Sequence, residues 1–300
     1  MSLSKFVIFF CLLWSVPQAS QSISVNEGIT KLIIDQDSEI SLVGSMQSGD
    51  IQIHSLEVDE GEFVRISLPG FHTSNEIGSP ELPEIHKLIE IPQNAMPYIE
   101  VVNEETEYYN LSNFGIENPI FPHQPSLSKS QDPDDVLFEW NEAMYETDEY
   151  ISPDLISIDI KGQLRSLRLA NLVIRPVAYN PVSGIIKVTT NVEFIIHFDG
   201  ADLVKTENIK EKYYSPYFES VYSQVANYKE TYLRDDLVSY PVTYVIITNP
   251  IFENTLSEFI NWKIQKGFTV VVGNTSVIGS STSAIKSYIQ DLYENPTDGI

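Results

Sequence analysis

The succession strand, helix, strand, helix, predicted between Tyr244 and Asn295, is the feature that most constrains the fold. The apolar run Tyr244–Thr248 ends at the turn signal Asn249-Pro250 and predicts a strand. A second run, Thr269–Val272, is rich in β-branched residues and predicts another strand. Strands that are apolar on both faces and alternate with helices are typical of a parallel sheet covered by helices. We therefore predict the start of an α/β domain.

The two helices are predicted from apolar residues that recur three or four positions apart. They are Leu256, Phe259, Ile260 and Ile264 in the first helix, and Ile285, Tyr288, Ile289 and Leu292 in the second. Gly267 supplies the stop after the first helix. Since the sequence ends at Ile300, where a third strand is expected, we read residues 236–300 as a truncated α/β domain.

The residues before this domain, 21–235, carry short alternating runs separated by Gly and Pro. The runs are Ile29–Ile34, Ile40–Val43, Phe63–Leu68, Ile85–Ile91, Ile99–Val102, Leu167–Ile174, Ile185–Thr189 and Val192–Phe198. Period-two alternation indicates half-buried strands, and many of them with few helical patterns predict an antiparallel β-sandwich. We expect the second run to end at Gly44, and a tight turn at Asn180–Gly184.

Residues 103–154 differ from the rest, because they are acidic and punctuated by prolines. A long irregular segment in a compact domain is usually functional or mobile. Lys129 is the one basic residue between Lys87 and Lys161. Two interpretations stay open: a solvated surface lysine, or a side chain presented to a partner's pocket.

The pattern loosens from Asp199 to Tyr240, with a possible short helix over residues 216–228. Lys229, Arg234 and the pair Asp235-Asp236 mark a polar connection, so we place the domain boundary near residue 235.

The formal charge of -24 argues against a nucleic-acid partner, whose phosphates would be repelled. It permits calcium binding without indicating it. Asp132, Asp134 and Asp135 resemble part of a calcium loop but lack its glycine and distal glutamate.

The N-terminus predicts a secretory signal peptide over residues 1–20. Lys5 is followed by the apolar run Phe6–Trp14, which is too short to span a membrane. A secreted or cell-surface protein without a transmembrane segment is therefore expected. The single cysteine, Cys11, lies inside this signal, so the mature residues hold no thiol nucleophile.

The remaining sequence shows no chemical motif. There is no glycine-rich phosphate loop, and the histidines at 54, 72, 86, 123 and 197 have no metal-ligand spacing. We assign no catalytic, cofactor-binding or metal-binding residue.

Three blocks of the last 60 residues resemble the opening of the gingipain family of cysteine peptidases. They are Tyr244–Thr248, Phe259–Phe268 with its Trp262-Lys263-x-x-Lys266-Gly267-Phe268 run, and Ile285–Gln290. Upstream, Gly78-Ser-Pro-Glu-Leu-Pro, Ile91-Pro92 and Pro176-Val-Ala-Tyr-Asn-Pro-x-x-Gly184 resemble that family's propeptide.

The resemblance implies a β-sandwich propeptide that keeps a caspase-like α/β peptidase latent and assists its folding. The catalytic His and Cys of the family would lie beyond residue 300, so this chain should be inactive alone. The partners implied are its own peptidase domain and the protein substrates of the whole enzyme. Arg234, or else Lys229, is the expected processing site, and Lys129 is the expected inhibitory residue. The alternative is a secreted β-sandwich protein that binds or adheres without catalysis.

Overall fold

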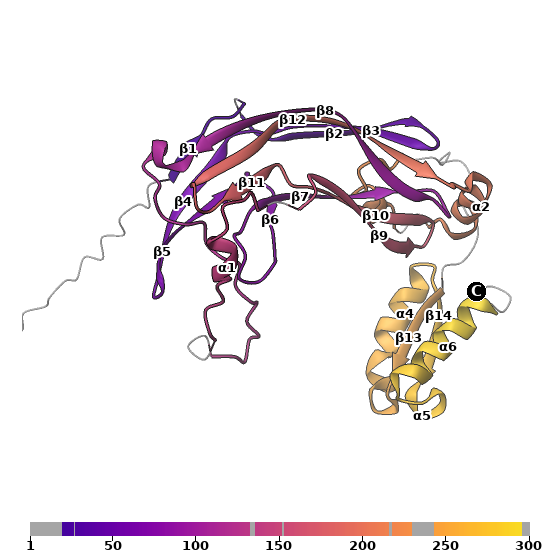
Figure 1. Ribbon diagram of the computed structural model, residues 1–300. Coiled ribbons are helices and arrows are strands. Elements are labelled where there is room, and N and C mark those ends of the chain that lie inside the picture. Colours follow the sequence, from indigo (N-terminus) through magenta and orange to yellow (C-terminus); the bar gives the residue numbers. More distant parts are fainter. Residues whose placement is uncertain are drawn as a thin grey trace, which may run out of the picture. The chain divides into compact units, whose positions relative to one another are not determined.

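The computed structural model describes residues 20–26, 28–132, 136–151, 153–215, 218–229 and 243–295 (Figure 1). The chain divides into two compact units, residues 1–214 with 220–229, and residues 215–219 with 230–300.

The first unit is built almost entirely from antiparallel strands. They are β1 Ser20–Ile23, β2 Lys31–Ser38, β3 Ser41–Gln47, β4 Ile51–Val58, β5 Gly61–Ser67, β6 His72–Thr73, β7 Pro83–Glu90, β8 Met96–Asn110, β9 Ile156–Leu164, β10 Leu167–Ile174, β11 Val177–Asn180 and β12 Ile185–Asp199. The helices found among the described residues of this unit are η1 Leu111–Phe114, α1 Glu142–Tyr145, α2 Leu203–Tyr213 and α3 Glu219–Tyr222. The predicted antiparallel β fold is confirmed.

The strands form two layers. One sheet has the order β11-β12-β3-β2, with β8 also paired to β12, and the facing layer contains the sheet β6-β7-β10-β9 (Figure 1). A third sheet, β1-β4-β5, lies at the end opposite α2 (Figure 1). The long strand β12 contributes to two cores, with Ile186 and Val188 in one and Phe194 and Ile196 in the other.

The prediction for β12 was wrong in one respect. Two separate strands, Ile185–Thr189 and Val192–Phe198, were predicted where the structure has one continuous strand. The polar residues between them, Thr190 and Asn191, lie in the strand at a shift of its register with β8. Buried Thr190 donates its hydroxyl to the Glu105 carbonyl at 3.2 Å, and Asn191 donates to the Glu105 carboxylate at 2.6 Å. Polar partners on β8 thus replace the water that a turn would have offered these side chains.

Three further expectations were incomplete. Strand β3 continues through Gly44, whose missing side chain makes room for Phe194. Residues 103–110 are not loop but the second half of β8, paired along β12, so the irregular segment begins at η1. The eleven-residue helix α2 lies in a region expected to be loose; Asp202 caps it by accepting from the Lys205 backbone N–H.

The second unit matches the predicted order of elements. Strands β13 Thr243–Thr248 and β14 Thr269–Asn274 pair in parallel, as expected. Between and after them lie η4 Pro250–Leu256, α4 Ser257–Gln265, α5 Thr275–Ile278 and α6 Thr282–Glu294. The Lys263 ammonium lies 4.4 Å from the Tyr244 ring centre and 5.2 Å from that of Phe268. The run Trp262–Phe268 therefore fixes the end of α4 against β13 through cation–π contacts.

Candidate functional site

The candidate site is the connection between Gln124 and Glu139, which we call the 124–139 loop; residues 133–135 of it lie outside the described residues. In Figure 1 its described parts extend away from the two sheets beside α1. The loop has two stems, one on either side. The first stem leaves the β domain near Ile120, and the second returns to the domain at α1.

Gly78 holds both stems of the loop through its backbone. Its N–H donates to the His123 carbonyl at 2.8 Å, and its carbonyl accepts from the Asn141 N–H at 3.1 Å. Gly78 is buried and has a φ of 78°, in the region that favours glycine. A Cβ at this position would lie 3.2 Å from the Asn141 nitrogen. The glycine of the propeptide-like motif is therefore required at the base of the loop.

Gln124 closes the loop with its side-chain amide. Its Nε2 donates to the Glu139 carbonyl at 2.8 Å, and its Oε1 accepts from the Glu139 N–H at 2.9 Å. The same Nε2 lies 3.0 Å from the Pro122 carbonyl, to which it also donates. The carboxamide thus stands in for a peptide group and joins residues that lie 15 positions apart in the sequence.

An aromatic cluster packs beneath this closure. Its members are Phe63, Phe121, Phe138, Trp140 and Tyr145, with neighbouring ring centres between 4.4 and 6.3 Å apart. The Tyr145 hydroxyl donates to the Ile120 carbonyl at 2.6 Å, and burial raises the pKa of this phenol above its usual value. Aromatic pairs contribute beyond their buried area, so the cluster ties both stems to β5.

Glu81, from the same motif as Gly78, holds the first stem in place through His123. Its carboxylate accepts from Arg65 Nε at 2.7 Å and lies 3.0 Å from His123 Nδ1. Glu84 has a matching environment, with Arg175 Nε at 2.8 Å and His86 Nε2 at 2.9 Å. Both glutamates are buried, and each has two cationic or hydrogen-bonding partners, as buried carboxylates require.

Lys129 lies within the loop, between Ser128 and Ser130. It is exposed, and it occupies a turn in which the Gln131 N–H donates to the Ser128 carbonyl at 3.1 Å. Leu127 beside it is also 47% exposed. The loop therefore presents a cationic side chain and an apolar one to the outside, above a base fixed in the β domain.

Of the two processing candidates, Lys229 is the last residue of the first unit. Lys229 is exposed, and Arg234 lies outside the described residues. Two residues before Lys229, Asn227 bonds to both backbone groups of Glu90, accepting from its N–H at 2.7 Å and donating to its carbonyl at 3.0 Å. The Ala226 N–H donates to the Leu88 carbonyl at 2.8 Å. These bonds fix residues 226–227 to β7, directly before the connection begins.

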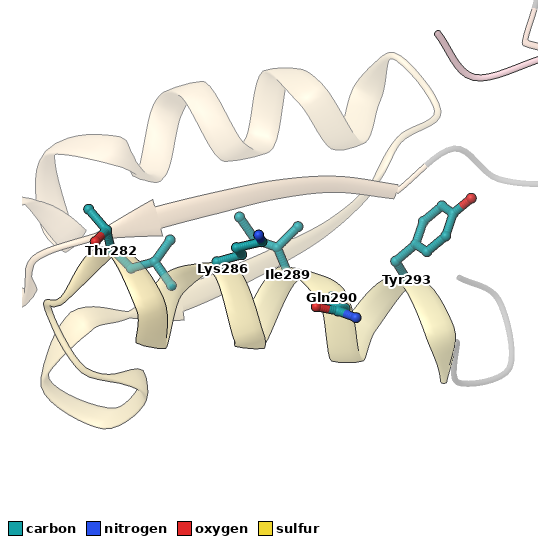
Figure 2. A pocket seen from close by; sticks show the side chains of 6 residues that line it. Thr282, Lys286, Ile289, Gln290 and Tyr293 are labelled. Atoms are coloured by element: carbon teal, nitrogen blue, oxygen red, sulfur yellow. The ribbon is translucent and has the colours of Figure 1, made fainter. Parts of the chain in front are cut away.

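A second candidate is a shallow hollow on α6, lined by Thr282, Ile285, Lys286, Ile289, Gln290 and Tyr293. Figure 2 shows that these side chains all come from one helix. The hollow is therefore an exposed helix face, and it gathers no set of polar groups for catalysis.

Within the described ranges, no group of three His, Cys, Asp or Glu side chains could hold a metal ion. Asp132 is described, whereas Asp134 and Asp135 lie outside the described residues. The same ranges contain no helix with the length and apolar character needed to cross a membrane.

The comparisons with known proteins agree with the two units. The family model described as Propeptide_C25 matches residues 31–234. The chain belongs to this propeptide family. The model for peptidase family C25 matches residues 238–299, so the start of a C25 peptidase domain follows the propeptide. The resemblance predicted from the sequence is confirmed.

Relatives in Porphyromonas gingivalis extend this finding. The chain is 33% identical to Lys-gingipain over 279 residues, which cover 92% of this chain and 16% of that protein. It is 22% identical to Gingipain R2 over 226 residues, which cover 73% of this chain and 29% of that protein. The chain thus spans less than a third of the length of either relative.

Two solved structures share the fold. A structure described as giving insight into the zymogenic latency of gingipain K is 33% identical, with a TM-score of 0.58; the match covers 61% of this chain and all of that chain. A complex of the RgpB pro- and mature domains is 16% identical, with a TM-score of 0.53, over 66% of this chain and 98% of that chain. Both come from Porphyromonas gingivalis.

Of the predicted site residues, the structure places Lys129 in an exposed turn and Lys229 beside an anchored segment. The residues at the base of the loop were not predicted as functional. Gly78 had a usable signal, since it opens the propeptide-like motif, whereas Gln124 and Glu139 had none in a single sequence.

Proposed function

We propose that this chain is the N-terminal part of a secreted, gingipain-like cysteine endopeptidase precursor, with a signal peptide over residues 1–20. In this proposal residues 21–235 form the propeptide, which assists folding and keeps the peptidase latent, and residues 236–300 begin the peptidase domain. One observation carries the proposal: Lys129 lies in an exposed turn of a loop whose base is bonded to a propeptide-family domain.

Latency requires that substrate be kept from the catalytic cleft. A cationic side chain on an exposed loop suits an acidic primary pocket, as in an enzyme that cleaves after a basic residue. The name of the relative Lys-gingipain supports a pocket of this kind. Lys129 would then occupy the pocket that the substrate's basic residue fills, and the rest of the loop would cover the cleft.

The chain on its own should not hydrolyse peptides. Cysteine peptidases need a thiolate nucleophile with an assisting histidine. The sequence holds one cysteine, Cys11, and it lies in the proposed signal peptide. The chain should therefore act on its peptidase as an inhibitor.

The test is inhibition of the mature peptidase by the chain, with Lys129→Ala as the variant. Removing one partner of a buried ion pair costs about 2–5 kcal/mol, so the inhibition constant should rise at least about tenfold. Lys161→Ala is the matched control, because Lys161 is an exposed lysine on β9 that pairs with Asp159. Equal inhibition constants for the wild type and Lys129→Ala would show that Lys129 is an ordinary surface lysine.

A further inference from the structure

We propose that helix α2 is a protease-sensitive segment, and that the ion pair between Lys210 and Glu90 keeps it attached to the β domain. When the pair is broken, α2 unfolds locally and becomes a substrate for a peptidase that cleaves after basic residues. The identity of that peptidase rests on the proposed function, whereas the sensitivity of α2 follows from its own contacts. The pair thus protects the propeptide from the enzyme that it inhibits.

The first argument is the number of cleavable residues in α2. The helix carries Lys205, Lys210 and Lys212 within its eleven residues. Lys205 and Lys212 are exposed. Proteolysis acts on the transiently opened state of a folded segment, so these lysines are cleaved only when the helix opens. The rate of cleavage within α2 therefore reports how often the helix leaves the domain.

The second argument is that α2 is attached mainly through polar groups. Thr206, which is polar, is the buried residue of the helix, and Val204 is 74% exposed. The Gln93 N–H donates to the Thr206 hydroxyl at 2.9 Å, and the Asp202 N–H donates to the Gln93 carbonyl at 2.8 Å. A segment with few buried apolar contacts opens at a lower free energy than the core does. We therefore expect α2 to open while the sheets stay folded.

The third argument is the burial of the ion pair. Lys210 Nζ lies 2.8 Å from Glu90 Oε1, and the two side chains are only 17% and 13% exposed. Glu90 is the last residue of β7, and both of its backbone groups bond to Asn227, so the position of its carboxylate is fixed. Removing one partner leaves an uncompensated buried charge. Detachment of α2 returns that charge to water, so the loss of the pair favours the opened helix.

The experiment is limited proteolysis of the full chain with trypsin, which cleaves after lysine and arginine, followed by mass spectrometry. The test variants are Glu90→Gln and Lys210→Met, each of which removes one charge of the pair with little change in size. The controls are Glu193→Gln, at an exposed position on β12, and Lys212→Met, at an exposed position on α2. The measured quantity is the initial rate of the cut after Lys205, a residue that all four variants retain.

We expect the cut after Lys205 to be at least about tenfold faster in both test variants than in the wild type, because the opened population rises. The two controls should match the wild type. Lys161 of β9 and Lys187 of β12 report on the sheets. Cuts after these two lysines should stay as slow as in the wild type, because opening of α2 leaves the strands paired.

A parallel assay connects the pair with latency. The full chain is incubated with the mature peptidase, and inhibition is followed over time. Inhibition by Glu90→Gln should decay faster than inhibition by the wild type or by Glu193→Gln, because the peptidase cleaves the opened helix. Equal decay, with faster trypsin cleavage of Glu90→Gln, would overturn the protective role of the pair.

The outcomes separate the two proposals. An unchanged trypsin cut after Lys205 in both test variants would overturn this inference, whatever the chain does to the peptidase. Cuts after Lys161 and Lys187 that speed up as much as the cut after Lys205 would also overturn it, because the pair would then support the whole domain. A wild-type chain that fails to inhibit the mature peptidase would overturn the proposed function, and the trypsin assay would still decide whether the pair controls α2.

Discussion

Gly44 of β3 lies against the ring of Phe194 of β12, so that a Cβ on residue 44 would be 2.1 Å from the ring's Cζ. Phe194 is fully buried in the core between the two sheets. The ring therefore occupies the space that a side chain on β3 would need.

Gly44→Ala should destabilise the first unit by about 1–3 kcal/mol, because overpacking forces a buried ring or the strand to move. Urea unfolding monitored by circular dichroism measures this change. The double variant Gly44→Ala with Phe194→Leu should recover part of the loss. If Gly44→Ala alone were as stable as the wild type, the close contact would not constrain the fold.

Glu81→Ala should lower stability by leaving Arg65 and His123 without their shared carboxylate. Breaking a fully buried pair costs about 3–5 kcal/mol, and the 44% exposure of the Arg65 side chain reduces this to about 2–3 kcal/mol. Glu81→Gln, which keeps hydrogen-bonding oxygen, should lose less. Asp159→Ala serves as the control, since it removes an exposed pair worth about 0–1 kcal/mol. Equal losses for Glu81→Ala and Asp159→Ala would contradict the buried anchor.

The raised pKa of Tyr109 predicts that the folded chain loses stability at alkaline pH. Burial, and then the hydrogen bond that its hydroxyl donates to Glu107 at 2.5 Å, raise the pKa of Tyr109 from 10.0 to about 12. The folded chain thus holds this proton more tightly than the unfolded chain. The contribution is complete below pH 10 and is lost as the pH rises through about 12.

Unfolding by urea at a series of pH values checks this expectation. Tyr109→Phe should show a flatter decline of stability over that range than the wild type. Tyr98→Phe, which removes a phenol that is 54% exposed, is the control. The same decline in wild type and Tyr109→Phe would show that other groups cause the alkaline loss.

The elements that the sequence predicted well are those whose pattern is local. Leu167–Ile174 forms β10 at the predicted bounds, and Thr269–Val272 lies within β14. Gly44 and the pair Thr190-Asn191 were misread because their roles depend on distant partners, Phe194 and β8. Their local chemistry, a glycine and two polar residues, is otherwise that of a turn.

In the candidate site, too, the sequence could predict the features that are local and not those that depend on distant partners. Lys129 could be selected because its charge is isolated in the sequence, and that property is visible without a structure. The closure of Gln124 on Glu139 could not, because a side-chain amide that replaces a backbone pair leaves no periodic or compositional trace. Pairings of this kind depend on how the chain folds back, which no residue in the intervening loop specifies.

Processing of the precursor should occur after Arg234, with Lys229 as the second candidate. The bonds of Ala226 and Asn227 to β7 keep the chain up to residue 227 attached to the domain, and both candidate sites follow these bonds in the sequence. N-terminal sequencing of the matured protein should give Asp235 as the first residue. Arg234→Ala should slow maturation or move the start to Glu230, and a start far from both positions would contradict the assignment.

Residues 240–300 expressed alone should be aggregated or only loosely packed, whereas residues 21–235 should fold alone. The reason is the apolar surface of the second unit: Ile289 of α6 is 46% exposed, Tyr293 is 64% exposed, and both line the hollow in Figure 2. Two parallel strands with so much uncovered apolar surface favour association and fluctuating packing. We expect fragment 240–300 to bind a hydrophobic dye and to melt without a sharp transition. Ile289→Lys should reduce dye binding, while Gln290→Lys, one position along the same helix, should reduce it less. A soluble monomer of residues 240–300 with a cooperative thermal transition would show that the unit is stable by itself.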